Sequence, residues 1–333
     1  FKATFSISLV ITIIGNIATI FAPNFAWMMV VQILATCATG VLDNGPSSFA
    51  VVLFTKHTAV LFCIMSATYG LGAFVAPIFA RLIQRLIEGA GYKQIYLWMN
   101  VPLLVILVFF LCVPFAIKKP QSTSSNTSSV WKYLKSPLVW YLAIMLNLMA
   151  TAERGTLNWG TLYVKDVLHL DEALGANLCS QFYLIFMIAR SLGGFITDWI
   201  GPFWMEYIIM PLGIVVYVVG FAMQNRYSLY VLPFTGLFVS LYWPTAVVSC
   251  TSYWGEGSGL PVSCILPLQS VVGILIQYLL GVMNDKWGPQ YAYWMSVPAA
   301  VISLLMLIGF DIICRRKKAR EEKEALLNNQ DVV

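Results

Sequence analysis

The chain has 333 residues, of which 59% are hydrophobic and 11% are charged, and its net charge at pH 7 is +5. With a mean hydropathy of +0.78, this composition excludes an ordinary soluble domain and indicates a polytopic membrane protein. The positive charge does not indicate nucleic-acid binding, because much of it comes from the tail segment Arg315–Arg320 rather than from a basic face. The seven cysteines lack the spacing of a disulfide framework or a metal site, and no cofactor is expected.

Ten segments are long and apolar enough to cross a bilayer as helices, which requires ~20 mostly apolar residues. Cutting the chain at polar residues and at proline or glycine gives approximate spans of 4–22, 26–54, 58–87, 94–117, 137–163, 172–197, 203–224, 228–253, 260–284 and 290–313. The predicted fold class is therefore an all-α membrane protein.

A polar segment rich in serine and threonine, residues 118–136, separates the first four spans from the last six and can form no apolar core. The predicted organisation is a four-helix bundle over 1–117, this cytoplasmic linker, a six-helix bundle over 137–314 and a cytoplasmic tail over 315–333. If the halves are parallel repeats, as in the commonest transporter architecture, two helices that precede the first span are expected to be missing from this sequence.

Two predicted loops of the six-helix half share the pattern G-x-x-x-D-x-x-G. The repeated positions are Gly194, Asp198 and Gly201 in the first copy and Gly281, Asp285 and Gly288 in the second. Three spans lie between the copies, which places them on opposite membrane faces, as inverted repeats require. Because the glycines permit close helix approach and the aspartates can bond a helix N-terminus, we expect both loops to latch one conformational state.

Basic residues are more frequent on the side of the tail, which predicts a cytoplasmic C-terminus. Arg190 is counted among the basic residues close to that inner face. The plasma membrane is slightly favoured as the location, and the acidic dileucine pattern in Glu322–Leu327 makes endosomal or vacuolar delivery the alternative.

Two of the carboxylates inside predicted spans are candidates for a site: Asp43 within the sequence Gly-Val-Leu-Asp-Asn-Gly-Pro, and Glu153 beside Arg154. A charge at the centre of a spanning helix costs at least ~2.5–3.5 kcal/mol, so it usually faces a water-filled cavity or a partner. We expect Asp43 and Glu153 to bind the coupling ion, a proton or sodium. The alternative is a structural ion pair of Arg154 with one of them.

Amide and aromatic side chains gather on the same spans. Amides exchange hydrogen bonds with hydroxyl groups and aromatic rings stack on sugar rings, so these side chains suit a neutral sugar or polyol better than an anion. The expected solute-binding residues are Asn44, Asn158, Trp159, Gln181, Tyr242 and Gln269, together with Arg154. The alternative for each amide is bonding between helices, worth only ~0.6 kcal/mol on average.

The two glycine–aspartate loops, the polar linker and the basic tail together resemble the major facilitator superfamily, although Trp199 stands where the family loop usually has a basic residue. The resemblance implies a twelve-helix bundle, of which the first two helices are absent here. Within the superfamily the chain is similar to the fucose/galactose/glucose symporter group and its fungal relatives, through residues 43–45 and 67–77, Glu153 with Trp159, and residues 242–245. That group uses a carboxylate on its fourth helix in proton coupling, and Asp43 falls in the matching region.

The expected function is secondary active symport of a monosaccharide or similar small polar solute, by alternating access and coupled to protons or sodium. No catalytic constellation is visible, so an enzyme is not expected. Two alternatives stay open: an organic anion carrier in which Arg154 binds the solute, and a receptor-like pseudo-carrier that does not transport.

Overall fold

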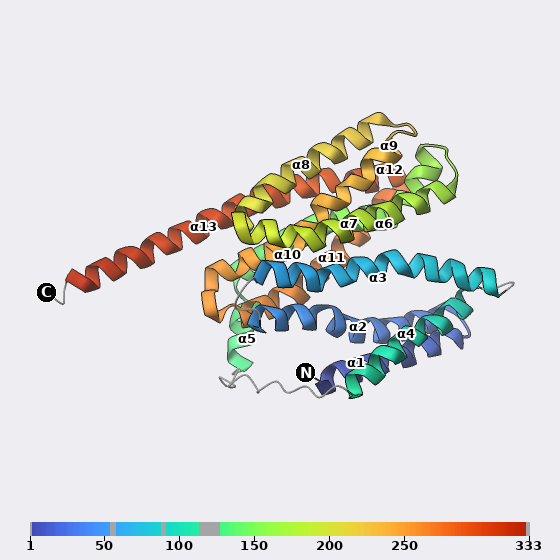
Figure 1. The fold of residues 1–333 in the computed structure, drawn as a ribbon, viewed down its shortest axis with the longest axis horizontal. Coiled ribbons are helices and arrows are strands. Elements are labelled where there is room, and N and C mark those ends of the chain that lie inside the picture. Colours follow the sequence, from blue (N-terminus) through green and yellow to red (C-terminus); the bar gives the residue numbers. More distant parts are fainter. Residues whose placement is uncertain (1, 54–57, 88–90, 113–126, 331–333) are drawn as a thin grey trace. The chain divides into compact units, whose positions relative to one another are not determined.

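The computed structural model describes residues 2–53, 58–87, 91–112 and 127–330. Every regular element within these ranges is a helix, so the predicted all-α fold is confirmed (Figure 1). The chain forms two compact units, one built from Phe1–Phe49 and Val75–Asn126 and the other from Ala50–Phe74 and Thr127–Val333.

The first unit holds α1, α4, most of α2 and the second part of α3. Their bounds are α1 Lys2–Ile20, α2 Phe25–Leu53, α3 Thr58–Leu86 and α4 Tyr92–Cys112. Helices α1 and α4 lie side by side (Figure 1), and the Nδ2 atom of Asn16 donates a hydrogen bond of 3.2 Å to the Oδ1 atom of Asn100 between them.

The second unit holds the first part of α3 and all helices from α5 onward. Their bounds are α5 Thr127–Leu134, α6 Pro137–Leu162, α7 Glu172–Ile200, α8 Pro202–Met223, α9 Ser228–Val231, α10 Thr235–Trp254, α11 Gly259–Trp287, α12 Pro289–Trp294 and α13 Ser296–Gln330. A π-helical turn at Tyr163–Val167 follows α6. Short 3₁₀ turns at Leu232–Phe234 and Gly255–Gly257 flank α10.

Nine helical stretches of the described ranges are long and apolar enough to span a membrane. Helix α6 is not among them, although its bounds agree with the predicted span 137–163. Its first half carries Asn147 and its second half carries Glu153, Arg154 and Asn158, and these side chains lower its hydropathy. The polar character of α6 therefore sets it apart as the helix on which a site can be built.

The two glycine–aspartate motifs form equivalent turns. Gly201 ends α7 with φ +90°, and Gly288 ends α11 with φ +96°; each is followed by proline as the first residue of the next helix. In both turns the glycine N–H donates a 2.8 Å hydrogen bond, to the carbonyl of Thr197 and of Asn284 respectively. Because the backbone at both glycines lies in a region reserved for glycine, the shared sequence pattern encodes a shared turn.

The core of the second unit is rich in aromatic side chains whose hydroxyls are bonded inside the bundle. The Tyr217 hydroxyl donates to the carbonyl of Ala152 at 3.0 Å, and the hydroxyls of Tyr293 and Thr156 are 3.0 Å apart. Both bonds tie α6 to helices distant in the sequence, which fixes the position of α6 within its unit.

Candidate functional site

One face of α6 meets α11 along a polar seam. The seam consists of Asn147, Arg154 and Asn158 on α6 and of Gln269, Gly273 and Gln277 on α11. The spacings of four and seven residues place each set on one helix face. The Nδ2 atom of Asn147 donates a 2.7 Å bond to the Gln269 carbonyl, and Nδ2 of Asn158 donates a 2.9 Å bond to Oε1 of Gln277.

Gly273 makes room for the guanidinium in the middle of this seam. A Cβ atom at Gly273 would lie 2.5 Å from Nη1 of Arg154 and 2.7 Å from Nδ2 of Asn147. A side chain at this position would displace the ends of the Arg154 and Asn147 side chains, so glycine lets both groups occupy the interface between α6 and α11 in the positions described.

Several polar atoms of the seam are buried without a hydrogen-bond partner in the described part of the chain. They are Oδ1 of Asn147, Oε1 of Gln269 and Nε2 of Gln277, and Nε1 of the neighbouring Trp159. Arg154 likewise makes no salt bridge with any described residue. Leaving a buried polar group unpaired costs ~1–3 kcal/mol, so these atoms are suited to water or to a polar solute.

Glu153 points to a different neighbour from Arg154, as the ~100° rotation between consecutive helical residues requires. The Tyr183 hydroxyl on α7 donates to Oε1 of Glu153 at 3.4 Å. The Glu153 carboxylate also lies within electrostatic reach of the Arg190 and Arg154 guanidinium groups. The Tyr183 ring lies 6.5 Å from the Tyr69 ring of α3. We call Glu153, Tyr69, Tyr183, Phe186 and Arg190 the Glu153 cluster.

Arg190 of α7 is 4% exposed and lies in the interior of the second unit. Its Nε donates a 2.7 Å bond to the Ser240 carbonyl of α10, Nη1 donates a 3.3 Å bond to the Ser66 carbonyl of α3, and its guanidinium lies 4.1 Å from the centre of the Phe186 ring. The Ser240 carbonyl is available because Pro244, four residues later, has no N–H to donate to it. Interior carbonyls on two helices therefore stabilise this arginine inside its unit.

The other predicted solute-binding residues do not all join the seam. Tyr242 is 1% exposed, and its hydroxyl lies 2.9 Å from Oγ of Ser303 and 3.3 Å from the Met145 carbonyl, so it is satisfied inside the bundle. Gln181 is exposed on α7. Asn44 is on α2, and its side chain lies outside the described part of the structure.

Asp43 is an exposed residue of α2 in the first unit, whereas Glu153 belongs to the second unit. In the predicted latch loops, Asp198 and Asp285 are both exposed, and Nδ2 of Asn284 donates a 3.3 Å bond to Oδ1 of Asp285. The structure therefore gathers Glu153 with Arg190, and Arg154 with Asn158 and Gln269.

The sequence prediction missed Arg190 as a member of the site. The available signal was a single arginine within the apolar span 172–197, together with a proline inside the span 228–253 that frees a carbonyl. The missing information was that the two helices meet at these residues.

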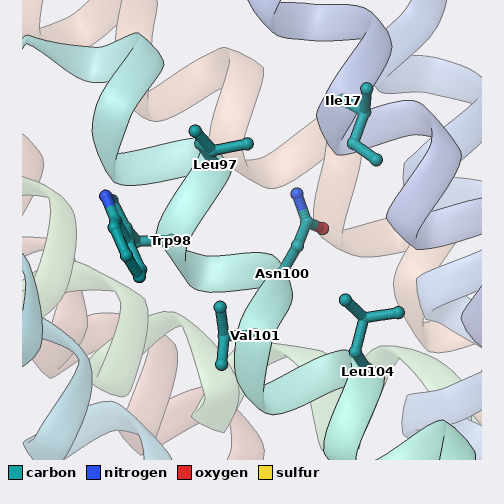
Figure 2. Close-up of a pocket in the computed structure, with 6 residues that line it drawn as sticks. All are labelled: Ile17, Leu97, Trp98, Asn100, Val101 and Leu104. Atoms are coloured by element: carbon teal, nitrogen blue, oxygen red, sulfur yellow. The ribbon is translucent and has the colours of Figure 1, made fainter.

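The first unit contains an apolar pocket between α1 and α4 (Figure 2). Its lining residues are Ile17, Leu97, Trp98, Asn100, Val101 and Leu104. Asn100, the polar member, is 3% exposed, and its amide bonds to Asn16 and to the Tyr96 carbonyl. With its polar atoms occupied and no predicted site residue in its wall, this pocket offers little to a polar solute.

Among the described residues, no three His, Cys, Asp or Glu side chains gather in a way that could hold a metal ion. The chemistry open to the site is therefore binding through amides, a guanidinium and aromatic rings, together with proton transfer at a carboxyl.

Solved structures with a similar fold are membrane transporters. A crystal structure of the E. coli fucose:proton symporter FucP aligns with a TM-score of 0.72 at 15% identity, over 93% of this chain and 83% of that chain. A bacterial homologue of the iron transporter ferroportin aligns with a TM-score of 0.66 at 14% identity, over 93% and 83% of the two chains. The human organic anion transporter MFSD10 aligns with a TM-score of 0.65 at 10% identity, over 92% and 76%.

At these identities the structural matches establish the fold. The family follows from the sequence model of the Major Facilitator Superfamily, which matches residues 1–264 and thus most of the chain. Together with the apolar helices, this makes the protein a multi-pass integral membrane carrier rather than an enzyme. The chain belongs to the major facilitator superfamily.

Proposed function

We propose that the protein is a secondary active symporter that moves a monosaccharide or similar small polar solute by alternating access, driven by a proton or sodium gradient. The observation that carries the proposal is the polar seam, which combines unpaired amide atoms with the Arg154 guanidinium at the Gly273 notch. A neutral polyol offers both donors and acceptors and matches that mixture.

Glu153 is the proposed coupling residue of the second unit. It stands next to the seam residue Arg154 in the chain, and its carboxylate interacts with Tyr183 and Arg190. Binding of a proton or sodium ion at Glu153 would cancel the negative charge that faces Arg190, and the contacts between α6 and α7 would then change with ion occupancy. Asp43 is the proposed second coupling residue, on α2.

The solute-binding role falls on Arg154, Asn158, Trp159 and Gln269, which lie in or beside the seam. The predicted roles of Asn44, Gln181 and Tyr242 stay proposals, and the internal bonds of Tyr242 favour a structural role for it. We further propose that the turns at Gly201 and Gly288 latch one conformational state, with the aspartates of the same motifs.

The direct test is uptake by proteoliposomes containing the full-length protein, with a panel of labelled sugars and an imposed proton or sodium gradient. We expect Glu153→Gln to lose accumulation driven by the gradient while retaining exchange of solute. Asp43→Asn is expected to behave in the same way. Asp166→Asn, at an exposed carboxylate just after α6, is the matched control and should accumulate solute normally. Sugar uptake that is unaffected in Glu153→Gln would contradict the coupling role.

A second candidate is transport of an organic anion, and it is favoured by the lack of a salt bridge from Arg154 to any described residue. A carboxylate on the solute could take two parallel hydrogen bonds from the guanidinium. The class of solute taken up separates the two candidates: an anion carrier should take up labelled organic anions and lose that uptake in Arg154→Gln, whereas a sugar symporter should take up sugars and no organic anion. Absence of uptake of either class by folded protein would support a receptor-like pseudo-carrier.

For cellular placement we propose the plasma membrane, with the linker and the C-terminus in the cytoplasm. The acidic dileucine pattern in Glu322–Leu327 keeps endosomal or vacuolar delivery as the alternative. Microscopy of the full-length protein with and without Leu326→Ala and Leu327→Ala would distinguish the two locations.

A further inference from the structure

Glu206 on α8 is a buried acid that takes no part in the seam or in the Glu153 cluster. Its side chain is fully buried, in a helix that packs against α10 and α13. Oε2 accepts a hydrogen bond from the Ser249 hydroxyl of α10 at 3.4 Å, and Oε1 is buried without a partner among the residues that the structure describes. Among the described residues, only one of the two carboxyl oxygens of Glu206 thus accepts a hydrogen bond, and that bond is long.

No cation of the described structure forms a salt bridge with Glu206. The charged neighbour on α13 is Asp311, another acid, which takes its own ion pair with Arg315 at 2.8 Å and accepts a 2.7 Å bond from the Tyr207 hydroxyl. Lys317, also on α13, donates to the Tyr253 carbonyl at the end of α10. The nearby basic side chains are therefore used by other acceptors.

The remaining titratable groups around Glu206 bring no positive charge. On α10 they are Tyr242, whose hydroxyl lies 2.9 Å from that of Ser303, and the buried thiol of Cys250. On α13 the further titratable group is the thiol of Cys314, which is within electrostatic reach of Cys250. The start of α8 is also a weak source of stabilisation, because Glu206 lies beyond the first turn that begins at Pro202, where the helix dipole acts.

An ionised carboxylate in this position would carry an uncompensated charge, and removing such a charge from water is costly unless a cation and further hydrogen bonds replace the water. A bound metal ion is poorly suited to compensate this charge. Hard cations require several oxygen ligands, and the described side chains near the Glu206 carboxyl supply two hydroxyls, Ser249 and Thr245, of which Thr245 donates to the Leu241 carbonyl. A single proton removes the charge and needs no additional ligands.

We propose that Glu206 is a proton-binding site of the second unit, separate from the solute site. A proton taken from water adds to the carboxylate and gives a neutral acid, whose Oε2 still accepts from Ser249. The conformation described here is the one in which that proton is held.

Helix α10 gives this proton a means to be released during transport. Pro244 divides α10 between Ser240, which binds Arg190, and Ser249, which binds Glu206. A change of bend at Pro244 would move Ser249 relative to α8 and open Glu206 to water. This second step rests on the proposed alternating access, but not on the identity of the solute.

Infrared spectroscopy of the purified full-length protein tests proton binding directly. At neutral pH, the difference spectrum of wild type minus Glu206→Gln should contain a carboxylic acid C=O band that shifts in D2O. The matched control Glu322→Gln, at an exposed tail acid, should remove only carboxylate bands. Loss of carboxylate bands alone in Glu206→Gln would overturn the proposal.

Ser249→Ala provides a second variant should Glu206→Gln fold poorly. Because it removes the hydroxyl that donates to Oε2, it should shift the acid C=O band without abolishing it. An acid band unchanged by both Ser249→Ala and Glu206→Gln would assign that band to another group and overturn the site.

Transport assays then test release of the proton. Glu206→Gln should retain solute exchange and show a flatter pH dependence of net uptake than wild type. An unchanged pH profile would overturn release during transport. If wild type transports no solute at all, the proposed function fails, whereas the infrared result for proton binding is unaffected.

Discussion

Removing Pro244 should make Arg190 less important for stability, because both residues act on one carbonyl group. In the protein, the Ser240 carbonyl accepts a 2.7 Å bond from Nε of Arg190, and residue 244 has no N–H to offer it. Arg190→Met leaves this buried carbonyl unpaired, at a cost of ~1–3 kcal/mol. In the background of Pro244→Ala, the new N–H at 244 donates to the Ser240 carbonyl, and that part of the cost disappears.

The expected coupling energy between Arg190→Met and Pro244→Ala is therefore about 1–2 kcal/mol, with the double variant more stable than the sum of the singles predicts. The lost bond to Ser66 and the lost charge opposite Glu153 are common to both backgrounds and cancel in the cycle.

The assay is unfolding of the purified full-length protein in lipid–detergent micelles, followed by tryptophan fluorescence during titration with dodecyl sulfate. Pro267→Ala in α11 is the matched control, because Pro267 is not on the helix that Arg190 contacts. It should add to Arg190→Met within ~0.5 kcal/mol. If the unfolding free energies of Arg190→Met and Pro244→Ala add to within the same limit, Pro244 does not affect the bond between Arg190 and the Ser240 carbonyl, and the prediction is refuted.

Three glycine substitutions test other parts of the second unit by the same measurement, with Gly281→Ala, where no atom lies within 4 Å, as the neutral control. Gly201→Ala should lower the free energy of unfolding by ~1–3 kcal/mol, because the backbone at φ +90° favours glycine. A decrease no larger than that of Gly281→Ala would contradict this. Gly273→Ala should cost ~0.6–1.7 kcal/mol by displacing the Asn147 amide and should also weaken solute uptake; unchanged uptake would exclude the seam from binding. Gly236→Ala should cost ~1–3 kcal/mol without a specific loss of uptake, because its methyl would lie 2.5 Å from a backbone oxygen of α7.

The sequence contained enough information to locate most helices, because each span is a long apolar run ended by polar residues or by glycine and proline. The predicted span 137–163 agrees to within one residue with α6 at Pro137–Leu162. The predicted span 172–197 begins at the first residue of α7, Glu172–Ile200, and ends three residues before its last. Mean hydropathy alone does not indicate that α6 spans a membrane, because its polar and charged residues lower the average. Cutting the chain at polar residues and at proline or glycine nevertheless gives helix bounds that agree with α6.

The contacts within the site could not be predicted in the same way, because they depend on which helices meet. Glu153 and Arg154 were recognised as unusual from their position in one helix, and their divergence to α7 and α11 follows from helical geometry. The partners of Arg190 and Glu206 on α10 come from the packing of separate helices. Their sequence signals were only an arginine and a glutamate inside apolar spans.

Helix α10 connects these observations. Before Pro244 in the chain, Ser240 supplies a carbonyl to Arg190, and after it Ser249 supplies a hydroxyl to Glu206. Arg190 and Glu206 are the two most buried charged residues of the second unit among those described. A proline in a helix interior removes one backbone bond and is a common position for a bend. If α10 changes its bend during transport, the Arg190 contact and the Glu206 contact cannot both keep their geometry unless α7 and α8 move with it. A conformational change at Pro244 would therefore either alter the environment of at least one buried charge or move α7 and α8 together with α10, and both cases link ion binding to movement of the bundle.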